Sequence, residues 1–210
     1  MLEQIGIEAK TAAAEVAVLT SDKKNKILQS MADKLLKNTP KILGANKVDL
    51  DNSKNLELTA ALVDRLTLNE ERINGMASGL LKIIPLDDPV GNITSSWTTD
   101  EGLDIKKIRS PFGVIGVIYE ARPNVTSDVS GLCLKSGNAV ILRGSSYCLD
   151  TNIAILETLQ EALDENKCNK NIFQIIESKD RKDTLEFMNL TEYVGFNNTK
   201  GWQRLNTNIS

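Results

Sequence analysis

The chain has 210 residues and a net charge of −3, with 25 lysines and arginines against 28 aspartates and glutamates. This length and a 41% hydrophobic content are typical of a globular α/β protein with a sizeable core, and the balanced charge argues against nucleic acid as a partner. Histidine is absent, which excludes Ser-His-Asp triads, Cys-His pairs and imidazole ligands for a metal.

The cysteines and the N-terminal segment indicate the cellular compartment in which we expect the protein. The three cysteines, Cys133, Cys148 and Cys168, form no CxxC pair, so we expect reduced thiols and neither a disulfide framework nor a zinc site. Cys133 falls on an apolar helix face and is predicted to be an inert core thiol, and neither of the others has an obvious base. No apolar stretch has the length of a membrane span, and the segment MLEQIGIEAK lacks the basic-then-apolar layout of a secretory signal. We expect a cytoplasmic protein with no membrane partner.

Residues 1–84 are predicted to form a series of helices, because apolar residues recur there at helical spacing. Thr39 followed by Pro40 is predicted to supply the N-cap and first residue of a third helix. The pattern Thr67-x-x-Glu70 is predicted to be a capping box that opens a fifth helix, which Pro85 should end. Each helix should place one apolar stripe on a core.

From about residue 90 the pattern changes to short strands. The runs NITSSW and LDIKKIR, around the turn TTDEG, predict a hairpin at about 90–109. Residues 110–194 then alternate apolar runs of strand length (GVIGVIY, AVILR, IFQII) with amphipathic helices, beginning with a helix that should end near Gly137. Strand, helix and strand in this order predict a doubly wound α/β fold with a parallel sheet.

The candidate site follows from this sheet. Ligands of open parallel sheets bind beyond the C-terminal ends of the strands, which selects the turns after Tyr119 and after Leu142. Neither GxGxxG nor GxxxxGK[ST] is present. Arg122 could bind a phosphate or carboxylate, or pair with Glu120 instead. Asn124 could donate its amide to a developing oxyanion, or cap the following helix.

The strand-end residue Arg143 has two interpretations as well. It could reach the ribose or phosphate of a cofactor, or it could simply be solvated.

The segment GVIGVIYEARPNVTSDVSGLCLKSGNAVILRG closely resembles the cofactor-domain core of the γ-glutamyl phosphate reductase family (glutamate-5-semialdehyde dehydrogenases), within the aldehyde dehydrogenase superfamily. YEARPNVT is the most specific part, and the resemblance continues through LVDRLTLNEERINGMA and DDPVGN. It covers nearly all of this chain, from the first residue to about Val194, but only about the first half of the family's length. It implies an aldehyde-dehydrogenase-like fold with a Rossmann-like cofactor domain over residues 1–194, an oligomerisation hairpin and a separate catalytic domain.

The resemblance also implies a reaction. In the family a cysteine thiolate attacks γ-glutamyl phosphate, phosphate leaves, and NADPH reduces the thioester to glutamate 5-semialdehyde for proline biosynthesis. It implies a homo-oligomer formed through the hairpin, and glutamate 5-kinase as a partner. Carried over to this chain, the oxyanion donor is Asn124, and the residues lining the cofactor are Tyr119, Glu120, Ala121, Arg122, Pro123, Arg143, Gly144 and Ser145. The family often has a second Gly and Glu-Ala after Arg-Gly, where this chain has SSYC, so the preference for NADPH rests on the family.

The end of the chain departs from the family. The family's nucleophilic cysteine lies well beyond position 210, so we expect this chain to lack the catalytic domain and to be inactive by itself. After Val194 the family continues with something like DLIIPRGGKGL, whereas this chain has GFNNTKGWQRLNTNIS. Codons for the latter, read one base later, can encode Asp-Leu-Ile-Ile-Pro-Arg-Gly-Gly. We therefore expect a frameshift followed by a premature stop, with divergence of the tail or an artificial chain boundary as alternatives.

Two predictions follow from these expectations. Residues 195–210 should be irregular, because an Asn- and Gly-containing tail replaces a buried strand. The chain is then either part of a reductase or, alternatively, a non-catalytic dinucleotide-binding or oligomerising fragment.

Overall fold

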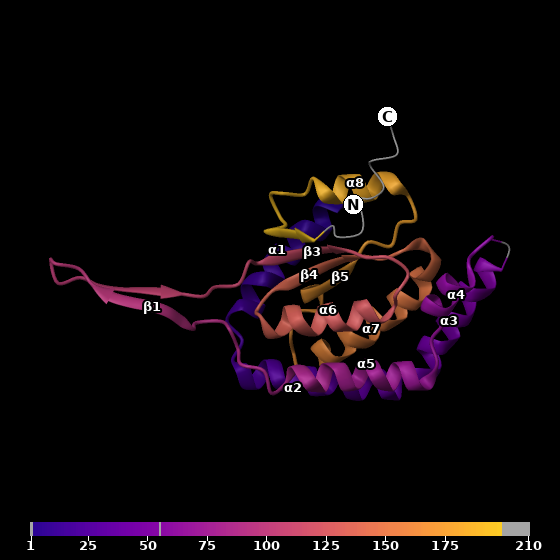
Figure 1. Ribbon diagram of the computed structural model, residues 1–210, viewed down its shortest axis with the longest axis horizontal. Coiled ribbons are helices and arrows are strands. Elements are labelled where there is room, and N and C mark those ends of the chain that lie inside the picture. Colours follow the sequence, from indigo (N-terminus) through magenta and orange to yellow (C-terminus); the bar gives the residue numbers. More distant parts are fainter. Residues whose placement is uncertain (1, 55, 199–210) are drawn as a thin grey trace.

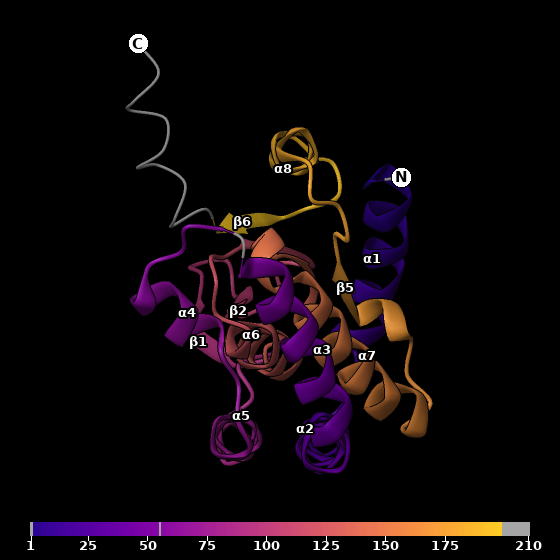
Figure 2. The same cartoon turned by 90° about the vertical axis from the view of Figure 1, so that its right-hand side faces the viewer.

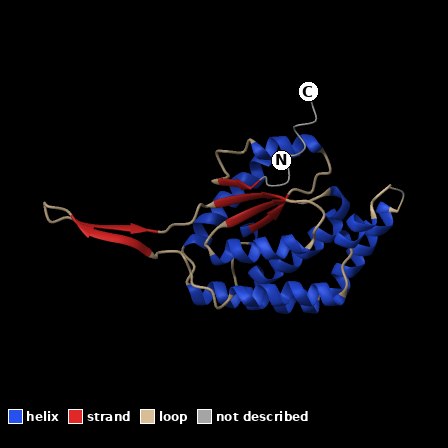
Figure 3. Cartoon of the chain, viewed as in Figure 1, coloured by secondary structure: helices blue, strands red, loops and turns tan. Residues whose placement is uncertain are grey.

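A four-stranded parallel sheet lies between layers of helices, and a two-stranded hairpin projects from one end of this body (Figures 1 and 3). The structure is a computed structural model that describes residues 2–54 and 56–198. The predicted fold class, an α/β protein with a parallel sheet, is confirmed.

The helical N-terminal part is also confirmed. It comprises α1 (Leu2–Ala17), α2 (Ser21–Lys37), α3 (Thr39–Ser53), α4 (Ala60–Leu66) and α5 (Glu70–Ile83). The last of these ends two residues before Pro85, as expected.

The predicted cap at the start of α3 is wrong. Thr39 is the first residue of the helix, and its hydroxyl donates backwards to the carbonyls of Leu35 and Leu36 (3.2 and 2.9 Å). Asn38 takes the N-cap position without a side-chain hydrogen bond, because it also ends α2 and has φ −92° and ψ 12°. An N-cap side chain reaches the helix from extended backbone, so two helices that share this one residue leave Thr39 no capping role.

The predicted capping box of α5 is wrong for a similar reason. Thr67 ends α4, and its hydroxyl donates to the Val63 carbonyl at 2.7 Å. Asn69 is the N-cap: its backbone is extended (φ −141°, ψ 174°), and its side chain accepts from the Arg72 N–H at 2.8 Å. The true cap therefore lies two residues later than predicted.

The sheet contains β3 (Val114–Ile118), β4 (Ala139–Arg143), β5 (Phe173–Ile175) and β6 (Phe196–Asn198), in the order β5-β4-β3-β6. Every neighbouring pair is parallel, with Val117 opposite Leu142 in the central pair. The crossovers are α6 (Asn124–Lys135) and α7 (Leu149–Glu165), and α8 (Arg181–Met188) precedes β6. Two short 3₁₀ turns, η1 (Ser146–Cys148) and η2 (Lys170–Ile172), complete these connections.

Helices cover both faces of this sheet (Figure 2). On one face, α1 and α8 contribute Ala9, Ala13 and Phe187 to a core that includes Ile141. On the other face, Leu142 packs into a larger core with α6 and α7, and α2 and α5 form a further layer beyond them. The strands are consequently buried on both sides, which is why they are continuously apolar.

The C-terminal segment was predicted to be irregular from residue 195 onwards, and this is wrong for the part described. Gly195 donates its N–H to the Val114 carbonyl at 2.9 Å, and Phe196–Asn198 form β6 beside β3. Strand pairing uses backbone groups, so an asparagine-containing segment can extend the ladder despite its low β-propensity. Residues 199–210 lie outside the described residues. The frameshift stays a prediction, which the nucleotide sequence across this region would test.

The hairpin consists of β1 (Ile93–Thr98) and β2 (Asp104–Ile108), which pair antiparallel with Ile93 opposite Ile108 and Trp97 opposite Ile105. It confirms the prediction from the sequence. Its residues are exposed almost throughout, and Figure 1 shows it extending away from the body.

Candidate functional site

The carboxyl ends of β3 and β4 open onto a cavity of about 460 Å³, at the edge of the sheet where the sequence placed the site. We call it the strand-end cavity. It has a volume ordinary for a small-molecule site. Six of the eight predicted cofactor residues line it: Tyr119, Glu120, Ala121, Arg143, Gly144 and Ser145. The rest of the lining is Leu62, Ile118, Ser146, Tyr147, Lys179 and Thr184.

A chain of polar groups fixes Tyr119 in the wall of this cavity. The Thr126 hydroxyl donates to Oδ1 of Asn152 at 3.2 Å, so the Tyr119 hydroxyl, 2.7 Å away, donates to Thr126. Asn152 in turn donates from Nδ2 to Sγ of Cys148 at 3.3 Å. Burial raises the pKa of Tyr119 well above its ordinary value, so the ring carries a neutral hydroxyl at physiological pH. The network connects β3, α6, α7 and η1.

Glycine at position 144 is required by this packing. A Cβ there would lie 2.3 Å from Nδ2 of Asn152 and 3.1 Å from the Tyr119 hydroxyl. Both distances are shorter than ordinary van der Waals contact, so any side chain at Gly144 must displace the network or narrow the cavity.

Arg143 is the main cationic group of the strand-end cavity, and the interpretation that it is solvated is wrong. Only 5% of the residue is exposed. Nη1 donates to the Gly144 carbonyl at 2.8 Å and Nη2 to the Asp180 carbonyl at 3.3 Å, while Nε is buried without a partner in the described part of the chain. Burial lowers the pKa of the guanidinium, and the nearby Asp183 carboxylate opposes that shift. A buried guanidinium with an unused N–H fits an anionic ligand.

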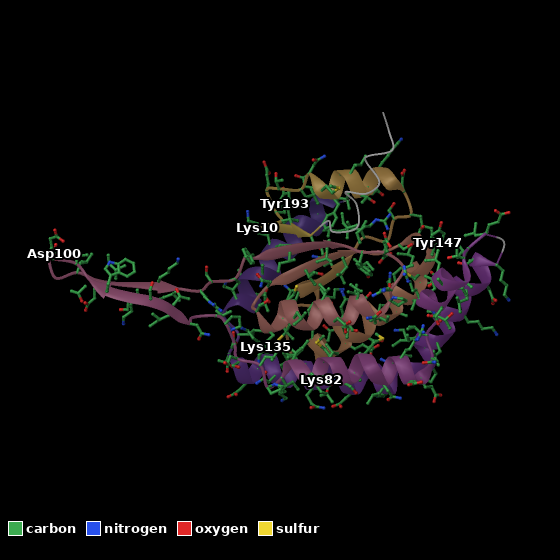
Figure 4. All side chains as sticks on the ribbon, in the orientation of Figure 1. Lys10, Lys82, Asp100, Lys135, Tyr147 and Tyr193 are labelled. Atoms are coloured by element: carbon green, nitrogen blue, oxygen red, sulfur yellow. The ribbon has the colours of Figure 1, made fainter. Side chains whose placement is uncertain are left out.

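Sequence reasoning missed part of the rim. Tyr147, with 37% exposure, lies at the end of the molecule opposite the hairpin tip marked by Asp100 (Figure 4). Lys179 and Thr184 follow β5, the third strand whose carboxyl end reaches this edge. Applying the strand-end rule to the segment after β5 would have pointed to Lys179, whereas Thr184 lies further on, within α8.

The turn between β3 and α6 separates two cavities. Glu120 and Ala121 line the strand-end cavity, whereas Arg122 and Asn124 line a neighbouring cavity of about 380 Å³. The Arg122 N–H donates to the Glu120 carbonyl at 2.7 Å, but no ion pair joins their side chains among the residues described. Arg122 thus lines the neighbouring cavity, and its predicted contact with the cofactor stays a prediction.

Asn124 does not cap α6. Pro123, which is buried, takes the N-cap position without a side-chain hydrogen bond, and Asn124 is the first helical residue. The Asn124 amide donates from Nδ2 to Oδ2 of Asp128 at 3.0 Å, one helical turn later. An amide has two N–H donors, so this bond orients the group and leaves a second N–H for another acceptor.

None of the three cysteines has the properties of a nucleophile. Cys133 and Cys148 are buried, and burial raises the pKa of each thiol to about 12. Cys168 is half-buried near η2, and burial raises its pKa as well. A reactive cysteine needs a lowered pKa and access to substrate, so these side chains are structural, as predicted for Cys133.

The described residues contain neither a cluster of metal ligands nor a helix suited to span a membrane. No cluster of three or more Cys, Asp or Glu side chains there could hold a metal ion. No helix described has the length and apolar character needed to cross a bilayer.

Comparison with known proteins adds the following. No family model matches the chain. It is 45% identical over 193 residues to γ-glutamyl phosphate reductase 2 of Bacillus licheniformis, which covers 92% of this chain and 46% of that protein. It is 46% identical over 202 residues to γ-glutamyl phosphate reductase of a Thermoanaerobacter species, which covers 96% and 49%. The chain spans about half the length of the curated relatives it matches.

Solved structures agree with these relatives. The crystal structure of γ-glutamyl phosphate reductase from Thermotoga maritima superimposes with a TM-score of 0.89 at 39% identity, covering 92% of this chain and 47% of that one. The corresponding yeast protein gives a TM-score of 0.82 at 28% identity, covering 91% and 49%. A probable aldehyde dehydrogenase from Listeria monocytogenes, at 13% identity and TM-score 0.66, shows the same fold.

Proposed function

We propose that this chain, a homologue of γ-glutamyl phosphate reductases, is the cofactor-binding part of such an enzyme, acting in the cytoplasm in proline biosynthesis. The reaction is the NADPH-dependent reduction of γ-glutamyl phosphate to glutamate 5-semialdehyde. The identity to two reductases, 45% and 46%, supports the family, and the strand-end cavity with its buried Arg143 supports the cofactor role. Arg143 is the observation that carries the proposal, because this buried cation, whose Nε has no partner among the described residues, lines a cavity at the sheet edge where dinucleotides bind.

The residues of the strand-end cavity suit different parts of a dinucleotide. NADPH, when bound, supplies the hydride for the reduction. Arg143 would bind a phosphate, and Ser145 and Lys179 add a hydroxyl and a second cation on the same rim. Tyr119, fixed by Thr126, gives the cavity a rigid wall at the end of β3. The cofactor side of the site is thus built on strand ends and not on a mobile loop.

Asn124 is proposed as the donor to the oxyanion. Asp128 holds one N–H of its amide, and the second is free to stabilise negative charge on a reacting carbonyl oxygen. Asn124 is the first residue of α6, directly after the turn that divides the cofactor cavity from the neighbouring one, so a carbonyl bound beside it would lie near the proposed cofactor site. This position supports a reaction at the boundary of the two cavities.

The thiolate is not among the proposed contributions of this chain, because Cys133 and Cys148 are buried with pKa values raised to about 12. We therefore propose that residues 1–198 supply the cofactor site, the oxyanion donor and, through the exposed hairpin, a surface for homo-oligomerisation. The same observations favour one alternative, a dinucleotide-binding module that has no catalytic activity by itself.

A titration of the chain with NADPH, followed by the fluorescence of the nicotinamide, tests the cofactor role. We expect a micromolar Kd, and Arg143→Met should weaken binding about tenfold or more because a charge-assisted hydrogen bond is lost. Lys82→Gln removes a positive charge from the exposed face of α5, far from this cavity (Figure 4), and should leave the Kd unchanged.

Two outcomes would contradict the proposal. No NADPH binding to chain that is folded by circular dichroism would overturn the cofactor role. Equal affinity for NADH and NADPH would leave a dinucleotide site but overturn the preference for the phosphorylated cofactor.

A further inference from the structure

The neighbouring cavity, which we call the arginine cavity, lies outside the proposed cofactor site. It lies between α4, α5 and α6 and has a volume of about 380 Å³. Three arginines and two aspartates line it beside the Asn124 amide; the full lining is Asp64, Arg65, Leu68, Arg72, Gly75, Met76, Arg122, Asn124 and Asp128. The cavity therefore presents charges of both signs next to the proposed oxyanion donor.

One of the three arginines, Arg72, already has hydrogen-bond and ion-pair partners within the chain. Arg72 donates to the carbonyls of Asp64 and Thr67 and pairs with the Asp64 carboxylate at 2.8 Å. These bonds tie the end of α4 to the beginning of α5. Arg72 and Asp64 thus neutralise each other and set the shape of one wall.

The other two arginines are unused. Arg65 and Arg122 are exposed, and neither guanidinium makes a hydrogen bond or ion pair within the described residues. They come from different segments, the end of α4 and the turn before α6, and both line the same cavity. Two uncompensated guanidinium groups around one cavity favour a carboxylate or phosphoryl group as ligand.

Asp128 makes the cavity selective between these anions. Its carboxylate is half-buried, accepts a hydrogen bond from Asn124, and has no ion-pair partner among the described residues. Burial raises its pKa, which an approaching cation would reverse. A phosphoryl group with up to two negative charges would be repelled by Asp128. In a ligand that carries an ammonium group beside its carboxylate, the arginines would balance the carboxylate and Asp128 would balance the ammonium group.

We propose that the arginine cavity binds the amino-acid end of the substrate, with Arg65 and Arg122 receiving the α-carboxylate and Asp128 receiving the α-ammonium group. The inference rests on the proposed function, since it assigns one end of the same substrate. The reacting end then extends toward the free N–H of Asn124.

Gly75 allows the cavity to be filled without disturbing the fold. It lies within α5, lines the cavity, and a Cβ at this position would meet no atom within 4 Å. Gly75→Leu should therefore project a side chain into the cavity while improving helix propensity. Gly44 in α3 is a matched control, because it is also a helical glycine whose Cβ would meet no atom within 4 Å, and it does not line this cavity.

The test is an NMR titration of the isotopically labelled chain with three probes: L-glutamate, glutarate, which lacks the ammonium group, and inorganic phosphate. We expect L-glutamate to shift signals of α5 and α6 saturably, with a Kd in the millimolar range. The Kd for glutarate should be at least about fivefold higher. Gly75→Leu should lower the affinity for L-glutamate at least about tenfold, and Gly44→Leu should leave that affinity unchanged. Asp128→Asn should reduce the affinity for L-glutamate to that for glutarate.

Several results would overturn the inference. Phosphate binding as tightly as L-glutamate would indicate a general anion site, and unchanged binding to Gly75→Leu would place the ligand elsewhere. The absence of saturable shifts up to about 50 mM L-glutamate would also sink it, because binding weaker than that provides no useful recognition. A parallel NADPH titration separates the two proposals: chain that binds NADPH but not L-glutamate overturns only this inference, and chain that binds neither overturns both.

Discussion

The central strands and the hairpin strands have similar lengths but opposite environments. In β4 all five residues are buried, whereas in β1 all six are exposed. Isoleucine occurs in both places: Ile141 is fully buried, and Ile108 is 55% exposed. The helices that pack on both faces of β4, which the hairpin lacks, account for this difference between two isoleucines. The covered strands end at the strand-end cavity, while the uncovered ones leave apolar side chains such as Trp97 and Ile108 exposed.

The largest expected effect comes from removing side-chain volume from the covered sheet. Leu142→Ala should lower the free energy of unfolding by about 2–5 kcal/mol, because it leaves a cavity between the sheet and its helices. Ile108→Ala in the hairpin should change it by less than about 0.5 kcal/mol. Urea unfolding followed by circular dichroism measures both, and similar losses for the two variants would break the comparison.

A smaller loss is expected at the floor of the strand-end cavity. In Gly144→Ala the new Cβ would lie 2.3 Å from Nδ2 of Asn152, so we expect a loss of stability of about 1–3 kcal/mol. The affinity for NADPH should fall with it, because the same network positions Tyr119.

The second substitution Asn152→Ala removes the atom that clashes and serves as the control. The double variant should be more stable than the sum of the single losses predicts, as for residues in direct contact. Strict additivity in a double-mutant cycle would show that the two positions do not interact.

The next effect depends on pH and concerns Asp49, which caps α7 from α3 by accepting from the Thr151 N–H and hydroxyl (2.7 and 2.5 Å). Burial raises its pKa above 3.8, so the folded state binds a proton more readily than the unfolded state does. Its contribution to stability should therefore fall as the pH rises from about 4 through the raised pKa, by about 1 kcal/mol or less, because the hydrogen bonds from Thr151 partly offset the effect of burial.

Asp49→Asn keeps a side-chain oxygen and removes the titration. The stability of the original chain relative to this variant should decrease over that pH range in urea unfolding experiments. A difference that increases with pH would mean that the hydrogen bonds from Thr151 outweigh burial.

The smallest effect on stability is expected in the hairpin, where Trp97 and Ile108 are 50% and 55% exposed. Trp97→Ser combined with Ile108→Ser should change the free energy of unfolding by less than about 0.5 kcal/mol. It should still reduce self-association in analytical ultracentrifugation if this surface joins copies of the chain, as proposed. Unchanged association would remove the hairpin from the proposed interface.

Periodicity and the topology of parallel sheets account for most of what the sequence could predict. The helices before residue 84, the hairpin and the strands β3 to β5 all follow from patterns within a few residues. The caps at Thr39 and Thr67 were misplaced because a cap depends on backbone angles that neighbouring helices impose. The strand β6 was missed because it forms by backbone pairing with β3, about 80 residues earlier.

The candidate site was predicted in position but not in detail. The strand-end rule selected Tyr119 and Arg143, yet the burial of Arg143 depends on a contact with the carbonyl of Asp180, 37 residues later. The arginine cavity was not predicted at all, since Arg65 and Arg122 are distant in the sequence. Only the packing of α4 and α5 against α6 brings them together.

The turn between β3 and α6 is a common wall of both cavities, with Glu120 facing one and Arg122 the other. A ligand that shifts this wall from one side changes the free energy of binding on the other. Such coupling is reciprocal: if a dinucleotide alters the affinity for an amino acid by some factor, the amino acid alters the affinity for the dinucleotide by the same factor. Titrating one ligand in the presence and absence of the other would measure this coupling, whichever of the two is added first.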